Sequence, residues 1–195
     1  MEREIIMTGI GGQGVQLATK VLAHALNMEE KPVTHFAIFG GSMRGGDIEA
    51  IVITGDREIA APPMINQAWA TIAMHQSCID TMEKKVKPGG LVFANSSVIT
   101  KHISRKDATQ IDVPASELAE KTGHVMTLSM VMLGAFVEST HICKVQSVID
   151  AMKELTPSYR KQHIETNTQA INAGAEYART KLGKAGKQTL AWVTA

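Results

Sequence analysis

The beginning of the chain carries the pattern that most limits its fold: a short apolar run, a glycine-rich loop and a helical repeat. Residues 4–8 read as a buried strand, and the loop G-I-G-G-Q-G follows at residues 9–14. Apolar residues then recur at helical spacing, at Val15, Ala18, Leu22, Ala25 and Leu26. A strand that enters a helix through glycines is typical of parallel sheets that are covered by helices.

The same alternation continues along the chain. Further strands are predicted at residues 33–39, 48–54, 69–74, 91–94 and 109–113. Helices are predicted at residues 77–86, 114–123, 128–139, 144–155 and 160–182. Ser77 and Asp80 have the form of a capping box, and Lys87-Pro88-Gly89-Gly90 is expected to stop that helix. The pattern predicts a three-layer α/β fold with a mostly parallel twisted sheet, helices on both faces and a helical C-terminal part.

Length and charge narrow the class of protein. The 195 residues predict one α/β domain over residues 1–183, followed by a flexible tail at 184–195. The formal net charge is +1 and aromatic residues make up 4% of the chain, so neither nucleic acid nor an acidic membrane is an expected partner. No apolar run approaches the ~18 residues of a membrane span, and the charged start does not resemble a signal peptide. We therefore expect a cytoplasmic protein.

Few residues are candidates for catalysis or metal binding. The chain has two cysteines, Cys78 and Cys143, and iron–sulfur or structural zinc sites usually need about four ligands. We expect two reduced thiols with structural roles, although His141 lies close to Cys143 in the sequence. The seven histidines show no ligand spacing, so we expect neither a catalytic residue nor a metal site. Met126, Met130 and Met132 are expected to fill gaps in a core or at a subunit interface.

The first glycine loop leaves three interpretations open. It satisfies G-x-G-x-x-G between a strand and a helix, and a helix N-terminus favours anions. A dinucleotide site would also need an acid near the end of the second strand, and residues 35–39 contain none. We therefore expect no NAD binding by this chain. An anionic or cofactor-proximal role is favoured over a purely structural turn, and its candidate residues are Gly9, Gly11, Gly12, Gln13 and Gly14.

A second glycine-rich loop follows the second strand. Gly40, Gly41, Gly45 and Gly46 flank Arg44. In a parallel sheet this loop lies beside the first one, at the carboxyl ends of the strands where ligands bind. Arg44 offers a planar donor fork that suits phosphate or carboxylate, and Gly45 and Gly46 would let the loop close over a ligand. The alternative is an internal salt bridge or a solvated side chain.

The two loops together resemble the gamma subunit, or gamma domain, of the 2-oxoacid:ferredoxin oxidoreductases. The resemblance rests on residues 9–15 and on the segment from Phe39 to Gly46, and it continues through residues 87–95, 132–135 and 167–174. That family includes the pyruvate, 2-ketoisovalerate, 2-oxoglutarate, indolepyruvate and phenylglyoxylate enzymes. This chain departs from the family pattern at residues 41–43, at Ser129 and at Ala70 or Thr71, which leaves the particular 2-oxoacid open.

The resemblance implies a multisubunit enzyme. Such enzymes decarboxylate a 2-oxoacid on thiamine diphosphate with Mg²⁺, pass the electrons through iron–sulfur clusters and release an acyl-CoA. The resemblance places the thiamine and cluster sites on partner subunits, so this chain alone is expected to bind none of these cofactors and to be inactive. Its glycine loops are expected to line the CoA or thiamine site at the subunit interface. The alternative is an independent nucleotide- or flavin-binding oxidoreductase domain.

Overall fold

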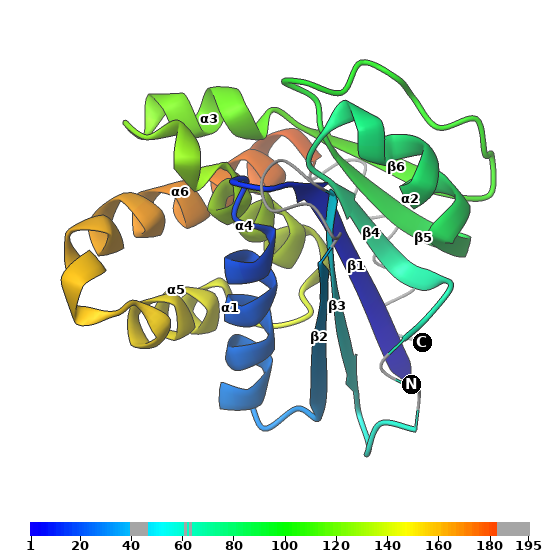
Figure 1. Ribbon diagram of the computed structural model, residues 1–195, viewed down its shortest axis with the longest axis horizontal. Coiled ribbons are helices and arrows are strands. Elements are labelled where there is room, and N and C mark those ends of the chain that lie inside the picture. Colours follow the sequence, from blue (N-terminus) through cyan, green and yellow to red (C-terminus); the bar gives the residue numbers. More distant parts are fainter. Residues whose placement is uncertain (40–46, 61, 63, 183–195) are drawn as a thin grey trace.

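The fold is built around one six-stranded sheet (Figure 1). The computed structural model describes residues 1–39, 47–60, 62 and 64–182, so the predicted tail at 184–195 lies outside the described residues. The strands are β1 (Glu2–Ile10), β2 (Val33–Phe39), β3 (Asp47–Gly55), β4 (Ala68–Ala73), β5 (Val86–Asn95) and β6 (Thr109–Val113). All six predicted strands are present among these residues, and the α/β class is confirmed.

The sheet is mixed, with the order β2-β3-β1-β4-β5-β6. The pairs β1–β4, β4–β5 and β5–β6 are parallel, whereas β3 runs antiparallel to both β1 and β2. Five strands therefore run in the same direction, and β3 runs antiparallel to them. The prediction of a mostly parallel sheet holds in this sense, and the edge at which β1, β2, β4, β5 and β6 end is called the carboxyl edge below.

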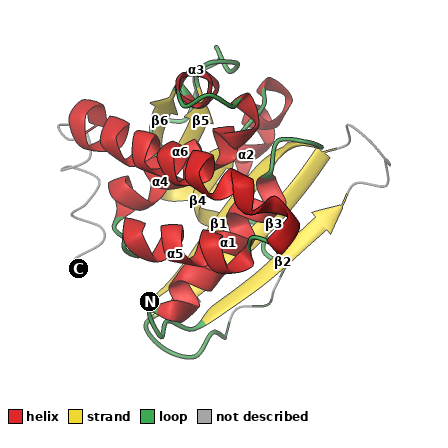
Figure 2. Cartoon of the chain, turned by 90° about the vertical axis from the view of Figure 1, so that its left-hand side faces the viewer, coloured by secondary structure: helices red, strands yellow, loops and turns green. Residues whose placement is uncertain are grey.

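Most helices cover one face of the sheet. They are α1 (Val15–Met28), α3 (Ala115–Lys121), α4 (Leu128–Thr140), α5 (Val145–Leu155) and α6 (Ile164–Tyr177), joined by short helices at Val125–Thr127, Ser158–His163 and Ala178–Leu182. Figure 2 shows α1, α4, α5 and α6 in front of the strands. On this face Phe136 of α4 packs edge-on against Phe93 and Trp69, with ring centroids 5.2 and 6.3 Å apart.

The opposite face is covered by α2 (Ile79–Lys85) and by the segment between β5 and β6. Central strand residues alternate between the two cores: Ile5 lies in the larger core and Ile6 in the smaller one. Burial on both faces explains why these strands read as continuous apolar runs.

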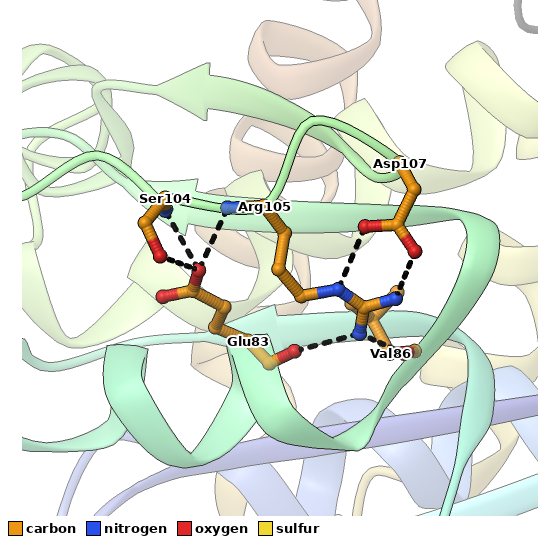
Figure 3. A network of polar contacts seen from close by, with 5 residues as sticks. All are labelled: Glu83, Val86, Ser104, Arg105 and Asp107. Carbon is orange, nitrogen blue, oxygen red and sulfur yellow. Dashed lines mark hydrogen bonds and ion pairs between the residues drawn. The ribbon is translucent and has the colours of Figure 1, made fainter.

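Polar contacts fasten the segment before β6 to the end of α2 (Figure 3). The Glu83 carboxylate accepts hydrogen bonds from the Ser104 hydroxyl and from the N–H groups of Ser104 and Arg105, at 2.7–2.9 Å. The Arg105 guanidinium forms a bidentate pair with Asp107 and also donates to the carbonyls of Glu83 and Val86. These hydrogen bonds lower two pKa values. The hydrogen bond from the Ser104 side chain is the main cause for Glu83, and the hydrogen bond from Arg105 is the main cause for Asp107.

Several predicted boundaries need correction. Residues 87–90 do not form a separate stop, because β5 already begins at Val86 and includes them. The predicted capping box at Ser77 is wrong: α2 follows a short helix at Gln76–Cys78, and the His75 side chain accepts the hydrogen bond from the Ser77 N–H. The last helix is divided into Ser158–His163, α6 and Ala178–Leu182.

Two helices of the larger core touch through their backbones. Gly134 of α4 lies against Ile171 of α6, and Gly174 of α6 lies against Val131 of α4. A Cβ atom at either glycine would overlap the carbonyl group of the residue opposite. Both positions are therefore restricted to glycine by packing, since backbone atoms cannot move aside as side chains do.

We predict that Gly134→Ala destabilises the fold by about 1–3 kcal/mol, the usual cost of overpacking a core. Gln169→Ala, on the exposed side of α6, is the matched control and is expected to change stability by less than about 0.5 kcal/mol. Urea unfolding followed by circular dichroism measures both. Equal stabilities for Gly134→Ala and wild type would show that the helices do not meet as closely as described.

Candidate functional site

The first glycine loop lies at the carboxyl edge, where β1 passes into α1. Gly12 and Gly14 have φ values of 101° and 77°, a region that residues with a Cβ rarely adopt. A Cβ at Gly14 would also lie 2.5 Å from the Ser129 hydroxyl oxygen, in the first turn of α4. Gly11 and Gly12 are exposed. The loop therefore packs against α4 at Gly14, and it is exposed at Gly11 and Gly12.

Gln13 holds the loop against the neighbouring strand. Its side-chain Oε1 accepts a hydrogen bond from the Ile10 N–H at 2.9 Å, and its Nε2 donates to the Met74 carbonyl at 3.2 Å. Gly9 lies directly beneath, because a Cβ there would be 2.5 Å from Oε1. Because both ends of its amide bond to the backbone, Gln13 shapes the loop. One N–H and one lone pair of this amide remain for a ligand.

The N-terminus of α1 lies at the end of this loop. Gly14 is its N-cap and has no side chain to cap the first N–H groups, and the first turn of the helix contains no acidic residue. Uncapped N–H groups and the helix dipole together favour an anion at this position. These features of the described loop agree with the expected anion-friendly surface, and the binding of an anion there stays a prediction.

The strands on either side of the second predicted loop reach the same edge. Phe39 pairs with Ile48 at the end of β2, and Asp47, at the start of β3, pairs with Ile10 beside the first loop. Residues 40–46, with the candidates Arg44, Gly45 and Gly46, lie outside the described residues. Their contribution to a site stays a prediction.

Asn95 is a further polar residue of the carboxyl edge whose role sequence reasoning did not find. It is fully buried at the end of β5, and its Oδ1 accepts hydrogen bonds from the N–H groups of Ala115 and Ser116. Its Nδ2 donates to the Ser116 hydroxyl at 3.0 Å and lies 3.5 Å from the Met74 carbonyl. Asn95 therefore caps α3 and ties β4, β5 and α3 together. The only signal in the sequence is a polar residue that ends an apolar strand.

A pocket of about 280 Å³ adjoins the first turn of α1. Leu17 of α1 forms one wall, Met126 another, and Arg160 and His163 come from the short helix before α6. His124 completes this side, with its ring edge-on to the His163 ring at a centroid distance of 6.2 Å. The pocket walls carry basic and apolar side chains together.

Both cysteines are free and buried. Burial raises the pKa of the Cys143 thiol to about 12, so this residue stays protonated at neutral pH and is not a nucleophile. Within the described part of the chain, no group of three His, Cys, Asp or Glu residues is placed to hold a metal ion. No helix of that part has the length and apolarity needed to cross a membrane.

Comparison with known proteins gives consistent results. The sequence matches the family described as Pyruvate ferredoxin/flavodoxin oxidoreductase over residues 4–177. The 2-oxoglutarate synthase subunit KorC of Methanothermobacter marburgensis is 29% identical over 183 residues, which cover 90% of this chain and 96% of that protein.

Two solved structures share the fold. The gamma subunit of a keto/oxoacid ferredoxin oxidoreductase from Geobacter sulfurreducens PCA has a TM-score of 0.80 and 25% identity, over 92% of this chain and 97% of that one. The 2-oxoglutarate:ferredoxin oxidoreductase of Magnetococcus marinus, with 2-oxoglutarate, coenzyme A and succinyl-CoA bound, has a TM-score of 0.81 at 18% identity. There 91% of this chain matches 31% of the longer chain. The family match runs from β1 to the end of α6, and the chain therefore belongs to the pyruvate ferredoxin/flavodoxin oxidoreductase family, where it resembles the gamma subunits.

Proposed function

We propose that this chain is the gamma-type subunit of a thiamine diphosphate- and iron–sulfur-dependent 2-oxoacid:acceptor oxidoreductase. The enzyme would convert a 2-oxoacid anion and the CoA thiol to an acyl-CoA, CO₂ and one proton, and pass the two electrons released to an acceptor. The observation that carries the proposal is the family match over residues 4–177, joined to the open, uncapped helix start at the carboxyl edge. The bound 2-oxoglutarate, coenzyme A and succinyl-CoA in the Magnetococcus enzyme support this reaction class.

The residues of this chain fit a supporting role in that reaction. An iron–sulfur cluster needs about four cysteine ligands, and the chain has two, both buried. Cys143 is held as a thiol by burial. The family resemblance implies that the thiamine diphosphate, Mg²⁺ and cluster sites lie on partner subunits, and we propose that this chain supplies binding surface and orientation.

The carboxyl edge suits the phosphates of CoA. Gly11 and Gly12 are exposed and carry no side chain that would keep a ligand from the backbone. The N-cap Gly14 has no side chain to cap the α1 N–H groups, and no acid lies in the first turn of α1. Thiamine diphosphate is anchored by a metal on its own subunit in such enzymes, so CoA is the ligand we assign here. Arg44, between strands β2 and β3 that both meet this edge, is proposed to bind an anionic group of the same ligand.

The strand order argues against an independent dinucleotide-binding domain. In that fold β2 lies next to β1, and an acid at its end holds the ribose. Here antiparallel β3 lies between β1 and β2. The end of β2 is therefore one strand further from the glycine loop than in that fold.

The isolated chain is expected to be colourless and unable to oxidise any 2-oxoacid. Co-expression with its partner subunits is expected to yield a complex that contains thiamine diphosphate and iron–sulfur clusters and that turns over a 2-oxoacid. Absorbance spectra and a substrate screen on both preparations measure this. Turnover by the purified, metal-free chain would refute the proposal, and a flavin spectrum would favour the independent oxidoreductase.

In the assembled enzyme, Arg44→Ala is expected to raise the apparent KM for CoA more than that for the 2-oxoacid. Loss of a charge-assisted contact costs about 1.5–3 kcal/mol, or about one to two decades in affinity. Steady-state kinetics with each substrate varied in turn measure the two constants. An unchanged dependence on CoA, or a complex that falls apart, would give Arg44 a structural role.

The described loop allows a second arm of the same test. Gly11→Asp places a carboxylate in the exposed loop that precedes α1, and Gly11→Asn adds nearly the same volume without charge. Repulsion of an anion predicts an apparent KM for CoA at least about tenfold higher in the Asp variant, equivalent to about 1.4 kcal/mol. Equal constants for the two variants would show that no anion binds beside this loop.

A further inference from the structure

Exposed apolar side chains gather around the pocket beside α1. Leu17 and Met126 line it and are 41% and 54% exposed. Val125 and Tyr159, the sequence neighbours of pocket residues, are 44% and 71% exposed. Of the three methionines expected to fill gaps, Met130 and Met132 are buried, and Met126 alone is on the surface. Contiguous apolar exposure rimmed by polar groups marks an interaction surface.

The ionisable side chains that line the pocket are basic. Arg160 and His163 line it with His124, and none of the described lining residues is acidic. The exposed Glu165, close to His163 in the sequence, accepts a hydrogen bond from Gln169. The Arg160 guanidinium lies 5.5 Å from the centre of the Tyr159 ring, and within the described residues no carboxylate pairs with it. A partner that neutralises this surface must carry negative charge.

The walls of the surface are formed in advance. The His124 side chain accepts a hydrogen bond from the Met126 N–H at 3.2 Å, and the Thr127 hydroxyl donates to the His124 carbonyl at 2.8 Å. The edge-on contact of His124 with His163 joins the segment before α4 to the segment before α6. A preformed surface loses little conformational entropy on binding.

We propose that this basic apolar surface, made of Leu17, His124, Met126, Tyr159, Arg160 and His163, docks an acidic segment with an apolar anchor from a partner subunit. The inference rests on the proposed function, because the partner is a subunit of the same enzyme. The pocket takes the anchor, and the rim pairs with the carboxylates. Arg, Met and aromatic side chains are enriched at protein interfaces.

The distribution of apolar side chains favours a protein segment over a small ligand. The pocket itself, at about 280 Å³, is at the small end of the range of ligand sites. Much of the apolar exposure lies outside it, on Val125 and Tyr159. The surface also adjoins the first turn of α1, next to the loop that is proposed to face the catalytic subunit.

The test measures assembly of the full chain with its purified partner subunits. Met126→Asp and Arg160→Glu are each expected to weaken the association at least about tenfold, through repulsion of an acidic segment and loss of apolar contact. The controls are Met64→Asp and Arg57→Glu, two exposed residues between β3 and β4 at the opposite edge, which are expected to bind as wild type does. Biolayer interferometry gives the affinities, and thermal unfolding shows that each variant is folded.

Salt dependence adds a readout that loss of folding cannot imitate. Added salt is expected to weaken the association of wild type, and Arg160→Glu is expected to lose much of that dependence. Wild-type affinity in both test variants, or equal losses in the controls, overturns the docking surface. Normal assembly with lost binding of CoA in the test variants also overturns it, in favour of a ligand pocket. If the wild-type chain itself does not assemble with thiamine and iron–sulfur subunits, the proposed function fails instead.

Discussion

The close crossing of α4 and α6 is the contact on which the rest of the structure depends. At Gly134 and Gly174 the two helices meet backbone to backbone, with no room for a Cβ on either side. This crossing places α4 in the centre of the larger core, where nearly all of its residues are buried and Phe136 joins it to β4 and β5. Every element on this face packs directly or indirectly against α4.

The geometry of the carboxyl edge depends on that crossing. The first turn of α4 brings Ser129 against Gly14, and this contact fixes the start of α1. Gln13 then ties the loop to Met74 at the end of β4. The same two helices place their N-terminal ends beside α1 and so form the basic apolar surface. A packing constraint deep in the core thus positions the loop that is proposed to bind an anion and the surface that is proposed to dock a partner.

Sequence reasoning identified the elements but not all of their relations. The strand at Thr109–Val113 was predicted at its observed bounds, because alternation and flanking turns define it. The reversed direction of β3 was not predictable, since a strand buried on both faces reads as the same apolar run in either direction. The Gln13–Met74 hydrogen bond joins residues 61 positions apart, so no local pattern reveals it. The cap on the short helix before α2 comes from His75, outside the predicted capping box.

Hydrogen–deuterium exchange on the free chain and on the assembled enzyme tests the central claim, that the carboxyl edge is the surface which assembly covers. The account predicts slower exchange on assembly at residues 11–18, 124–127 and 158–163. Residues 55–60, at the opposite edge of the sheet, are predicted to exchange at the same rate in both states. Protection confined to the opposite edge, with the glycine loop and the segments before α4 and α6 unchanged, would contradict the account.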